Sequence, residues 1–398
     1  MQSLRKLFKI GHGPSSSHTM GPGFAATYVK QKHPKATHYV VTLYNSLALT
    51  GKGHLTDAII EATLAPKPVT FKFNVDIKLH PNYFVFEVYD ADNLIDTVSV
   101  RSIGGGDILY DNEENHIETV YPHQSFDDIK AYCLSNNISL YDYVKAFEGP
   151  SIDVFLSEIW NQLQKTVEKG LVTEGVLPGD LKVQRKAKTL IDRAKATETE
   201  AQKQNRLVSA YAFAASEENG SGGIIVTTPT CGASGVLPAV LYYMRHHQSI
   251  TDQKIIESLA VAGIIGNIIK TNATISGAVG GCQAEVGSAC SMTAAAHAYL
   301  SDLELEQIEY AAEIAMEHHL GLTCDPIDGY VQIPCIERNA VAGIRAINAS
   351  SLAGFLSDTR KISFDMIVHT MYQTGLDMHP KYKETAEAGM AYFYKQKK

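Results

Sequence analysis

Apolar and polar residues alternate strictly along residues 70–79, TFKFNVDIKL, which is the clearest pattern in the first half of the chain. The apolar positions are Phe71, Phe73, Val75, Ile77 and Leu79. A period of two predicts a half-buried β-strand. The stretches YFVFEVYD (83–90) and LIDTVSVRSIGGG (94–106) follow after turn residues and predict further strands. A helix is expected before them, from about Pro22 to Lys32, so the first part of the chain should be a small α+β unit.

Helical spacing dominates the second half of the chain. Residues 151–170 place apolar side chains three or four positions apart, which predicts an amphipathic helix. Residues 252–270, 304–319 and 337–356 are rich in alanine and isoleucine and predict three more helices. Within the first of these, residues 259–269 are apolar nearly all round, which indicates a central buried helix.

The predicted fold class is α+β, with a small N-terminal mixed α/β domain followed by a larger all-α helical catalytic domain. We expect the small domain over residues 1–128, a connecting region over 129–150 and the helical domain over 151–398. The chain turns polar and irregular from about residue 112, and only residues 126–135 form a short amphipathic piece there.

Glycine-rich stretches interrupt the helical half. They are NGSGGIIVTTPTCGASG (219–235), SGAVGGCQAEVG (276–287) and CDPIDGYVQIPC (324–335). Loops inside a helical domain need a reason, because every buried backbone group must find a hydrogen-bond partner. Lining a cofactor pocket is one such reason.

Composition and charge narrow the class of protein. The chain has 398 residues, a formal net charge of −8 and a hydrophobic fraction of 45%, which is typical of a soluble globular protein. Basic residues gather at 181–195, but leucine and isoleucine keep a helical spacing there, so we interpret this stretch as a solvated helix face and expect no nucleic-acid partner. The longest apolar run is shorter than the roughly 20 residues that cross a bilayer. We therefore expect a cytoplasmic protein without a membrane partner.

Six cysteines raise the question of what they do: Cys133, Cys231, Cys282, Cys290, Cys324 and Cys335. Cytoplasmic thiols stay reduced, so a disulfide between Cys324 and Cys335 is not expected. Cys133 and Cys290 lie in helical segments and are interpreted as packing residues. Cys231 lies in a glycine-rich loop, where a polar contact and plain packing are both open.

Cys282, Cys324 and Cys335 remain, all among glycines and prolines. Three thiolates favour a soft metal, and both zinc and an iron–sulfur cluster qualify. Structural zinc sites usually show tight CxxC pairs, which this sequence lacks. A cubane cluster held by three thiolates keeps one iron free to act as a Lewis acid. Three unrelated loop cysteines are the alternative to a metal site.

Several motifs, in order along nearly the whole chain, resemble the iron–sulfur-dependent L-serine dehydratases (L-serine ammonia-lyases) of bacteria in their single-chain form. The motifs are GPSSSHTMGP (13–22), SLALTGKGHLTD (46–57), SIGGGDI (102–108), GVLPGDLKV (175–183), EENGSGGIIVTTPTCGASGVLPAVL (217–241), KTNATISGA (270–278), GAVGGCQAEVGSACSMTAAA (277–296) and CDPIDGYVQIPCIERNA (324–340). The resemblance implies that Cys282, Cys324 and Cys335 hold a 4Fe–4S cluster. It also implies that L-serine loses water and then ammonia to give pyruvate. We further expect a homodimer.

Elimination of water needs a base for the α-proton and a way to activate the hydroxyl group. His18 and His54 are the candidates, because glycine, serine and threonine surround both and both lie in resembling motifs. We expect His54 to be the base and His18 to orient the substrate, with the reverse assignment open. The expected substrate-binding residues are Ser15, Ser16, Ser17, Thr19, Lys270 and Asn272. These assignments place the active site between the two domains.

Alternative interpretations of the function remain open at this point. The same chemistry could serve threonine, cysteine or a hydroxy-dicarboxylate, since the sequence does not reveal the size of the pocket. A non-enzymatic iron or redox sensor would use the cluster as a switch, although no output domain is recognisable. Ser17 or Thr19 could simply cap the first helix, and Lys270 could be a charge at a helix C-terminus. A pyridoxal-phosphate dehydratase would need an α/β catalytic domain, which the helical half does not predict.

Overall fold

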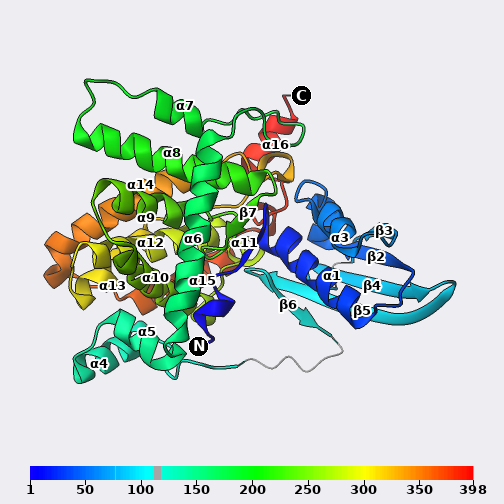
Figure 1. Cartoon of the computed structure of the whole chain (residues 1–398), viewed down its shortest axis with the longest axis horizontal. Coiled ribbons are helices and arrows are strands. Elements are labelled where there is room, and N and C mark those ends of the chain that lie inside the picture. The colour runs from blue at the N-terminus through cyan, green and yellow to red at the C-terminus, as the bar shows by residue number, and fades with distance from the viewer. Residues whose placement is uncertain (77, 112–117, 398) are drawn as a thin grey trace.

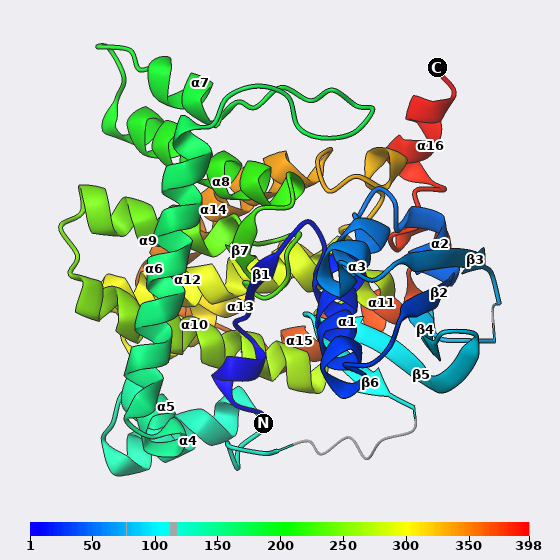
Figure 2. The same ribbon diagram turned by 45° about the vertical axis from the view of Figure 1, so that its right-hand side comes forward.

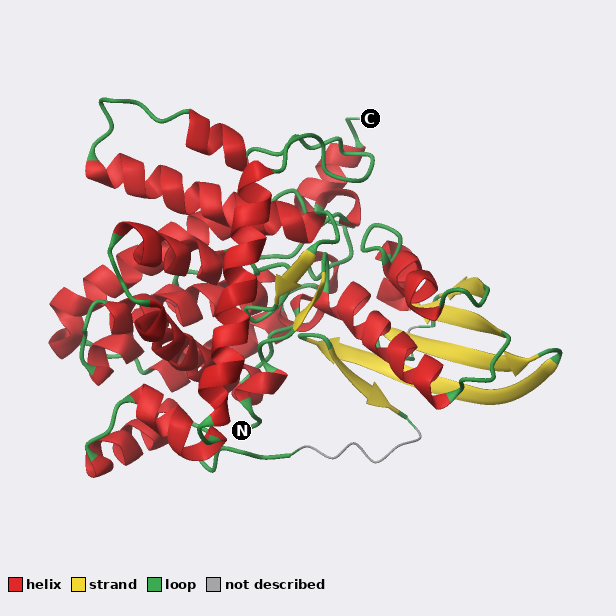
Figure 3. Ribbon diagram, viewed as in Figure 1, coloured by secondary structure: helices red, strands yellow, loops and turns green. Residues whose placement is uncertain are grey.

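A computed structural model describes residues 1–76, 78–111 and 118–397 of the chain. A sheet with its own helices lies at one end of the molecule, and a larger body of helices occupies the other (Figure 1, Figure 3). This architecture agrees with the predicted α+β class. The domain bounds stay a prediction.

Five strands form the main sheet of the described residues, in the order β3-β2-β4-β5-β6. Their bounds are β2 His38–Tyr44, β3 Val69–Asn74, β4 Tyr83–Asp90, β5 Asn93–Gly104 and β6 Asp107–Tyr110. β2 and β3 run parallel, and the other neighbours are antiparallel. Helices α1 (Gly21–Lys32) and α3 (Thr56–Leu64) cover one face (Figure 1) and bury an apolar layer against β2, β4 and β5. The expected helix at 22–32 and the strands at 83–90 and 94–106 are confirmed.

The predicted strand at 70–79 is too long. β3 ends at Asn74, and Phe73 and Val75 are 45% and 56% exposed. β3 is an edge strand, so the apolar side chains near its end have little to pack against. The chain then leaves the sheet, where the Asn45 side chain pairs with the backbone of Asp76. Ile77, part of the same prediction, lies outside the described residues.

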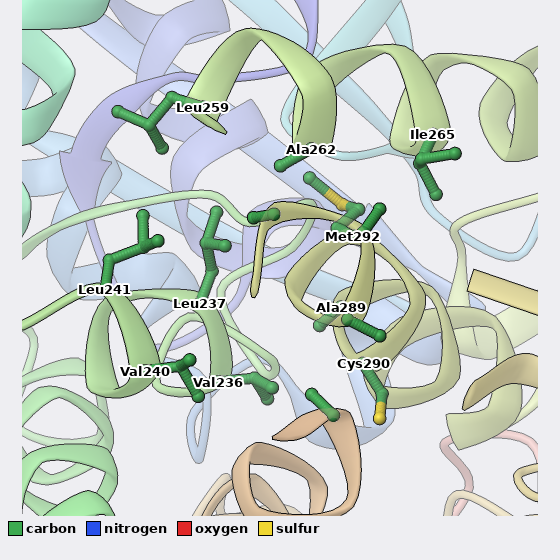
Figure 4. Close-up of a cluster of buried hydrophobic side chains, with 14 of the residues drawn as sticks. Val236, Leu237, Val240, Leu241, Leu259, Ala262, Ile265, Ala289, Cys290 and Met292 are labelled. Carbon is green, nitrogen blue, oxygen red and sulfur yellow. The ribbon is translucent and has the colours of Figure 1, made fainter. Parts of the chain in front are cut away.

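The helical body is built around α10 (Asp252–Asn272). The other helices are α4 Phe126–Asn136, α5 Leu140–Glu148, α6 Ser151–Val172, α7 Ala187–Asp192, α8 Glu200–Gly220, α9 Val236–His247, α12 Ser288–Leu300, α13 Leu305–Glu317, α14 Cys335–Leu356 and α15 Phe364–Asp377. Residues 258–269 of α10 are buried, which confirms the expected central helix. Figure 4 shows side chains of α9, α10 and α12 packed together in this core. α10 has the length and composition of a membrane span, but most of it is buried inside the protein, as in the core of a soluble protein.

Two stretches of the chain differ from the prediction: residues 129–150 are more helical than expected, and residues 181–195 are less helical. Residues 129–150 are not irregular, because α4 and α5 fill most of this stretch. Ser139 and Asp142 close a capping box at the start of α5, and Leu140 and Val144 bury its apolar face in the helical core. The basic stretch at 181–195 is helical only in the six residues of α7.

The N-terminus ties the two parts together. Met1, Leu4, Leu7 and Phe8 insert into the helical core rather than the sheet layer. β1 (Ile10–His12) then pairs antiparallel with β7 (Ile224–Val226) of the helical body before the chain enters the sheet region. The segment that follows β1 is therefore fixed at the junction between the two parts.

A glycine in α6 allows close helix contact and can be tested. A methyl group at Gly170 would collide with the backbone of Ala214 in α8. Gly170→Ala should lower the free energy of unfolding by about 1–3 kcal/mol through overpacking, although alanine is the better helix former. Gly354→Ala in α14 is the matched control, because its nearest neighbour, Leu303, lies 3.6 Å away. Urea unfolding should show no loss for this control, and equal stability of both variants would contradict the proposed contact.

Candidate active site

The two histidines selected from the sequence lie against each other and are buried. His18 lies in η2 (Ser16–Met20), which leads into α1, and His54 lies in the turn between α2 (Asn45–Thr50) and α3. Their ring centroids are 4.5 Å apart with an interplanar angle of 36°. His18 is 0% and His54 4% exposed.

A reciprocal pair of hydrogen bonds holds the two histidine segments together. The Thr19 hydroxyl donates to the backbone oxygen of His54 at 2.5 Å, and the Thr56 hydroxyl donates to the backbone oxygen of His18 at 2.5 Å. The backbone of each histidine is thus held by a threonine from the segment that carries the other histidine. Thr19 also accepts a hydrogen bond from the Ser15 backbone at 3.2 Å. Its hydroxyl is therefore engaged in positioning the histidines, and the structure offers no support for the expected contact between Thr19 and the substrate.

The protonation of His54 follows from its surroundings. Nδ1 lies 3.1 Å from the backbone oxygen of Thr50, which can only accept, so Nδ1 carries a proton. Burial lowers the pKa of His54 to about 4, with the Thr50 contact opposing the shift. At neutral pH the ring therefore has one proton, on Nδ1, and Nε2 keeps a free lone pair.

His18 is held differently. Its Nε2 lies 2.8 Å from the Ser46 hydroxyl, and Ser15 Oγ accepts a hydrogen bond from the His18 backbone N–H at 3.1 Å. Burial, with a contribution from His54, lowers the pKa of His18 well below its ordinary value. Both rings are therefore neutral at cellular pH, and a hydroxyl group already contacts Nε2 of His18. Ser15, not Ser17 or Thr19, caps this helix entrance.

The turn that carries His54 lies against the loop between Cys324 and Cys335. A methyl group at Gly53 would be 3.5 Å from the backbone oxygens of Asp328 and Gly329. The small part and the helical body therefore meet where the sequence places its candidate histidines and thiols.

The three selected thiols come together from three segments. Cys282 precedes η3 (Gln283–Gly287), Cys324 precedes η4 (Ile327–Gly329), and Cys335 begins α14. A hydrogen bond with Cys324 lowers the pKa of the Cys282 thiol, although burial opposes the shift, and Arg338 adds to it. Arg338 also interacts electrostatically with Cys335 and Cys324. All six cysteines are free, in agreement with the expected absence of a Cys324–Cys335 disulfide.

Two buried carboxylates complete the thiol cluster. One oxygen each from Glu285 and Glu384 and the sulfur of Cys324 lie within 4.8 Å of one another. Burial raises the pKa of Glu285, with further contributions from Glu384 and Cys282, and burial also raises the pKa of Glu384. Glu384 Oε2 has no hydrogen-bond partner among the described residues. A side chain at Gly277 would meet both carboxylates, which would have to shift.

This donor set fits a soft-metal group. Three thiols converge, one of them with a lowered pKa, and Arg338 supplies positive charge beside them. Soft thiolate ligands select zinc, copper(I) or iron–sulfur clusters. An orphaned buried carboxylate oxygen at the same place indicates that something polar or cationic belongs there.

The C-terminal segment forms part of this site, which the sequence did not reveal. The Cys324 backbone N–H donates to the Tyr382 oxygen, and the Glu384 N–H donates to the Cys324 oxygen, both at 2.8 Å. Asp325 accepts a hydrogen bond from the Met390 backbone at the start of α16 (Gly389–Lys395). Glu384 is 49 residues beyond Cys335 in the chain, and no local sequence signal marks it.

Other missed residues had a recognisable signal. Glu285 and Arg338 each follow a candidate ligand by three positions, Cys282 and Cys335 respectively. Residues three apart share a helix face, so these charges were candidates from spacing alone.

Lys270 and Asn272 are engaged elsewhere. The Lys270 ammonium forms an ion pair with Asp107 at 2.6 Å and donates to the Lys6 backbone. Asn272 donates to the backbone oxygen of Gln124 at 2.6 Å. Both contacts hold the C-terminal end of α10 in place. The structure therefore offers no support for the expected contact with a substrate.

The remaining cysteines are packing residues. Cys133 and Cys290 are buried in the helical core, and the Cys290 thiol donates to the Ala342 oxygen at 3.2 Å. Cys231 packs with Met20 and Ile225, so it joins η2 to β7, and burial raises the pKa of its thiol. Of the two roles left open for Cys231, the structure favours packing.

Sequence comparison agrees with this division of the chain into a histidine part and a thiol part. The family description "serine dehydratase beta chain" matches residues 3–68, and "serine dehydratase alpha chain" matches residues 105–391. The chain belongs to the serine dehydratase family. Both histidines fall in the beta-chain match and all three thiols in the alpha-chain match.

Individual members of the serine dehydratase family are similar over nearly the full chain. L-serine dehydratase 1 of Escherichia coli K12 is 38% identical over 449 aligned positions, covering 98% of this chain and 99% of the relative. L-serine dehydratase of Haemophilus influenzae is 37% identical, with coverage of 98% and 99%. That of Streptomyces coelicolor is 36% identical and covers 98% of both.

The lowered pKa of His54 makes a prediction about stability. Its pKa is about 4 in the folded protein against an ordinary 6.5, so between these values the unfolded chain binds a proton that the folded chain does not. The stabilising contribution is complete above about pH 6.5 and is lost as pH falls toward 4. Urea unfolding at pH 7.5 and 5.5 should therefore show a smaller loss of stability for His54→Gln than for the unaltered protein. An equal loss in both proteins would contradict a depressed pKa.

Proposed function

We propose that this chain is an L-serine dehydratase that converts L-serine to pyruvate and ammonia. Family membership and the names of the full-length relatives support the reaction. The observation that carries the mechanism is the free Nε2 of the buried His54, in a turn packed against the Cys324–Cys335 loop. A base and a soft-metal donor set at one junction are the two elements that elimination of water requires.

Cys282, Cys324 and Cys335 would hold a 4Fe–4S cluster in this enzyme. When bound, the cluster supplies a Lewis-acidic iron that makes a substrate hydroxyl a better leaving group. Arg338 offsets the negative charge of the thiolates, and it is held in place by a 2.6 Å hydrogen bond to the Thr323 oxygen. The buried Glu285 and Glu384 line the same place.

His54 would take the α-proton on Nε2. The Thr50 oxygen keeps the proton of the neutral ring on Nδ1, so the ring has the tautomer that a base requires. A pKa of about 4 means that the base is not blocked by protonation at cellular pH. Nε2 of His18 is already engaged by Ser46, which favours His54 as the base and His18 as its positioning partner.

The serine-rich turn would bind the substrate carboxylate. Ser16 and Ser17 are buried in the first turn of η2, which continues directly into α1. The positive end of a helix favours an anion. Ser15 caps this turn and fixes the His18 backbone, so the carboxylate and the histidine pair would share one support. We retain the cytoplasmic location and the homodimer as proposals.

Removing one thiol tests the metal group. Cys282→Ser, Cys324→Ser and Cys335→Ser should each lose most of the bound iron and sulfide together with pyruvate formation, because three thiolates are needed to hold the cluster. Cys133→Ser, a buried thiol outside the site, is the control and should retain both. Iron and sulfide analysis after anaerobic reconstitution measures the effect. Full iron content in any of the three ligand variants would remove that residue from the proposed set.

His54→Gln tests the base. We expect kcat to fall by about 100- to 10,000-fold, because a positioned base contributes that much, while iron content stays unchanged. His246→Gln, at the exposed end of α9, is the control and should behave like the unaltered enzyme. Pyruvate and ammonia are measured with L-serine, L-threonine and L-cysteine in parallel. Near-normal turnover of the His54 variant would reject this residue as the base.

A further inference from the structure

A cavity of about 410 Å³ opens between the small part and the C-terminal segment. Its walls come from α2, the loop after β3, α11 (Gly277–Gly280) and residues 380–385. These segments are distant in sequence but adjacent in space, and Figure 2 shows α2, α11 and α16 on the side where the two parts meet. The cavity therefore lies at the same junction as the candidate active site.

Three lining residues connect the cavity directly to the site. Ser46 is the hydroxyl that contacts Nε2 of His18 at 2.8 Å. Glu384 is the carboxylate beside Cys324. Ala278 lies four positions before Cys282 in the same glycine-rich loop. One wall of the cavity thus reaches the histidine pair and another reaches the thiol cluster.

Lys383 is the only cation among the described residues that line the cavity. The backbone of Lys383 pairs with that of Cys324. Cys324 is hydrogen-bonded through its backbone to Tyr382 and Glu384, the two neighbours of Lys383, so the position of Lys383 is fixed. Its ammonium group forms no ion pair with any described residue. The other lining residues are apolar or neutral, apart from Glu384. Lys383 thus places a positive charge without a direct ion-pair partner among the described residues in the wall of a mostly uncharged cavity, and Asp377 acts on it electrostatically.

We infer that this cavity is the channel by which the substrate reaches the active site, and that Lys383 binds the carboxylate of the incoming amino acid. The inference rests on the proposed function, because it takes L-serine as the substrate. Lys383 holds the carboxylate group during entry, before the serine-rich turn binds it in the active site, so the hydroxyl and ammonium ends of the molecule can advance toward Glu384 and the thiols. A cation in a cleft raises the local concentration of an anionic group and assists binding rather than the chemical step.

Lys383→Ala is the direct test. It should raise KM for L-serine about two- to fivefold with kcat and iron content unchanged, because a solvent-accessible charge contact contributes modestly. Lys383→Arg should restore KM, and Lys383→Glu should raise KM further. Lys381→Ala removes a lysine two positions away that is exposed and does not line the cavity, so it should match the unaltered enzyme. Equal effects of the Lys381 and Lys383 variants, or a change in kcat alone, would overturn the role of Lys383.

Narrowing the cavity gives a second test. Leu49 lines the cavity from α2 and is 64% exposed, so a larger side chain there should not disturb the core. Leu49→Trp should lower kcat/KM for L-serine, whereas Leu49→Ala should not. Unaltered kcat/KM and iron content in Leu49→Trp would show that the substrate arrives by another path.

A third measurement separates this inference from the proposed function. Acetate is a simple carboxylate, and its binding to the holoenzyme can be followed by saturation-transfer NMR without turnover. The signal should be weaker for Lys383→Ala than for Lys381→Ala. If the enzyme fails to form pyruvate but shows this difference, the proposed reaction is wrong and the carboxylate site stands. If pyruvate forms and acetate binds both variants equally, the reaction stands and the carboxylate site is wrong.

Discussion

Asp107 holds the two parts of the molecule together, and the active-site geometry depends on this contact. It begins β6 and lies between two lysines of different origin, Lys9 from the N-terminal segment and Lys270 from α10. Burial raises the pKa of Asp107, but the two lysines outweigh this effect and keep the pKa below its ordinary value. Lys9 also donates to the backbone oxygen of Gly105, and burial lowers its pKa to about 8. The three side chains are 12–21% exposed, so removing one of them leaves a partly desolvated charge without its partner and lowers the stability of the protein. These contacts hold the sheet against the helical body at the place where the turn that carries His54 meets the loop between Cys324 and Cys335.

This arrangement explains why the two histidines, the candidate catalytic groups, are buried and neutral. Two neighbouring histidines would repel each other if both were protonated, and burial removes the water that would screen the charges. Burial therefore lowers the pKa of each histidine. The reciprocal threonine hydrogen bonds fix their backbones, and the contacts of His54 Nδ1 with the Thr50 oxygen and of His18 Nε2 with the Ser46 hydroxyl orient the rings. Beside the thiols, burial raises the pKa values of the Glu285 and Glu384 carboxylates. The junction therefore brings an uncharged histidine, the candidate base, together with a set of candidate metal ligands, and the C-terminal segment closes it through the backbone of Cys324.

Long periodic segments were predictable from the sequence, and contacts between distant segments were not. β4, β5, α6, α10, α13 and α14 follow from their patterns of apolar residues. The predicted length of β3 was too great, because the alternation of apolar and polar residues continues past the point where this edge strand loses its neighbours. The histidines and thiols were found through glycine-rich loops and a family resemblance. Lys270 and Asn272 were chosen because they adjoin the Cys282 loop in sequence, but the end of α10 directs them to Asp107 and Gln124. Glu384 could not be found, because only the folded chain returns its C-terminal segment to Cys324.

We propose that a thiol-held metal group and a neutral histidine base act together at this junction. Iron, acid-labile sulfide and zinc analysis of anaerobically purified protein, combined with product analysis after addition of L-serine, tests this proposal. We expect about four iron and four sulfide per chain, with pyruvate and ammonia formed in equal amounts. Stoichiometric zinc without sulfide, or an intact cluster that yields no pyruvate from L-serine, would contradict it.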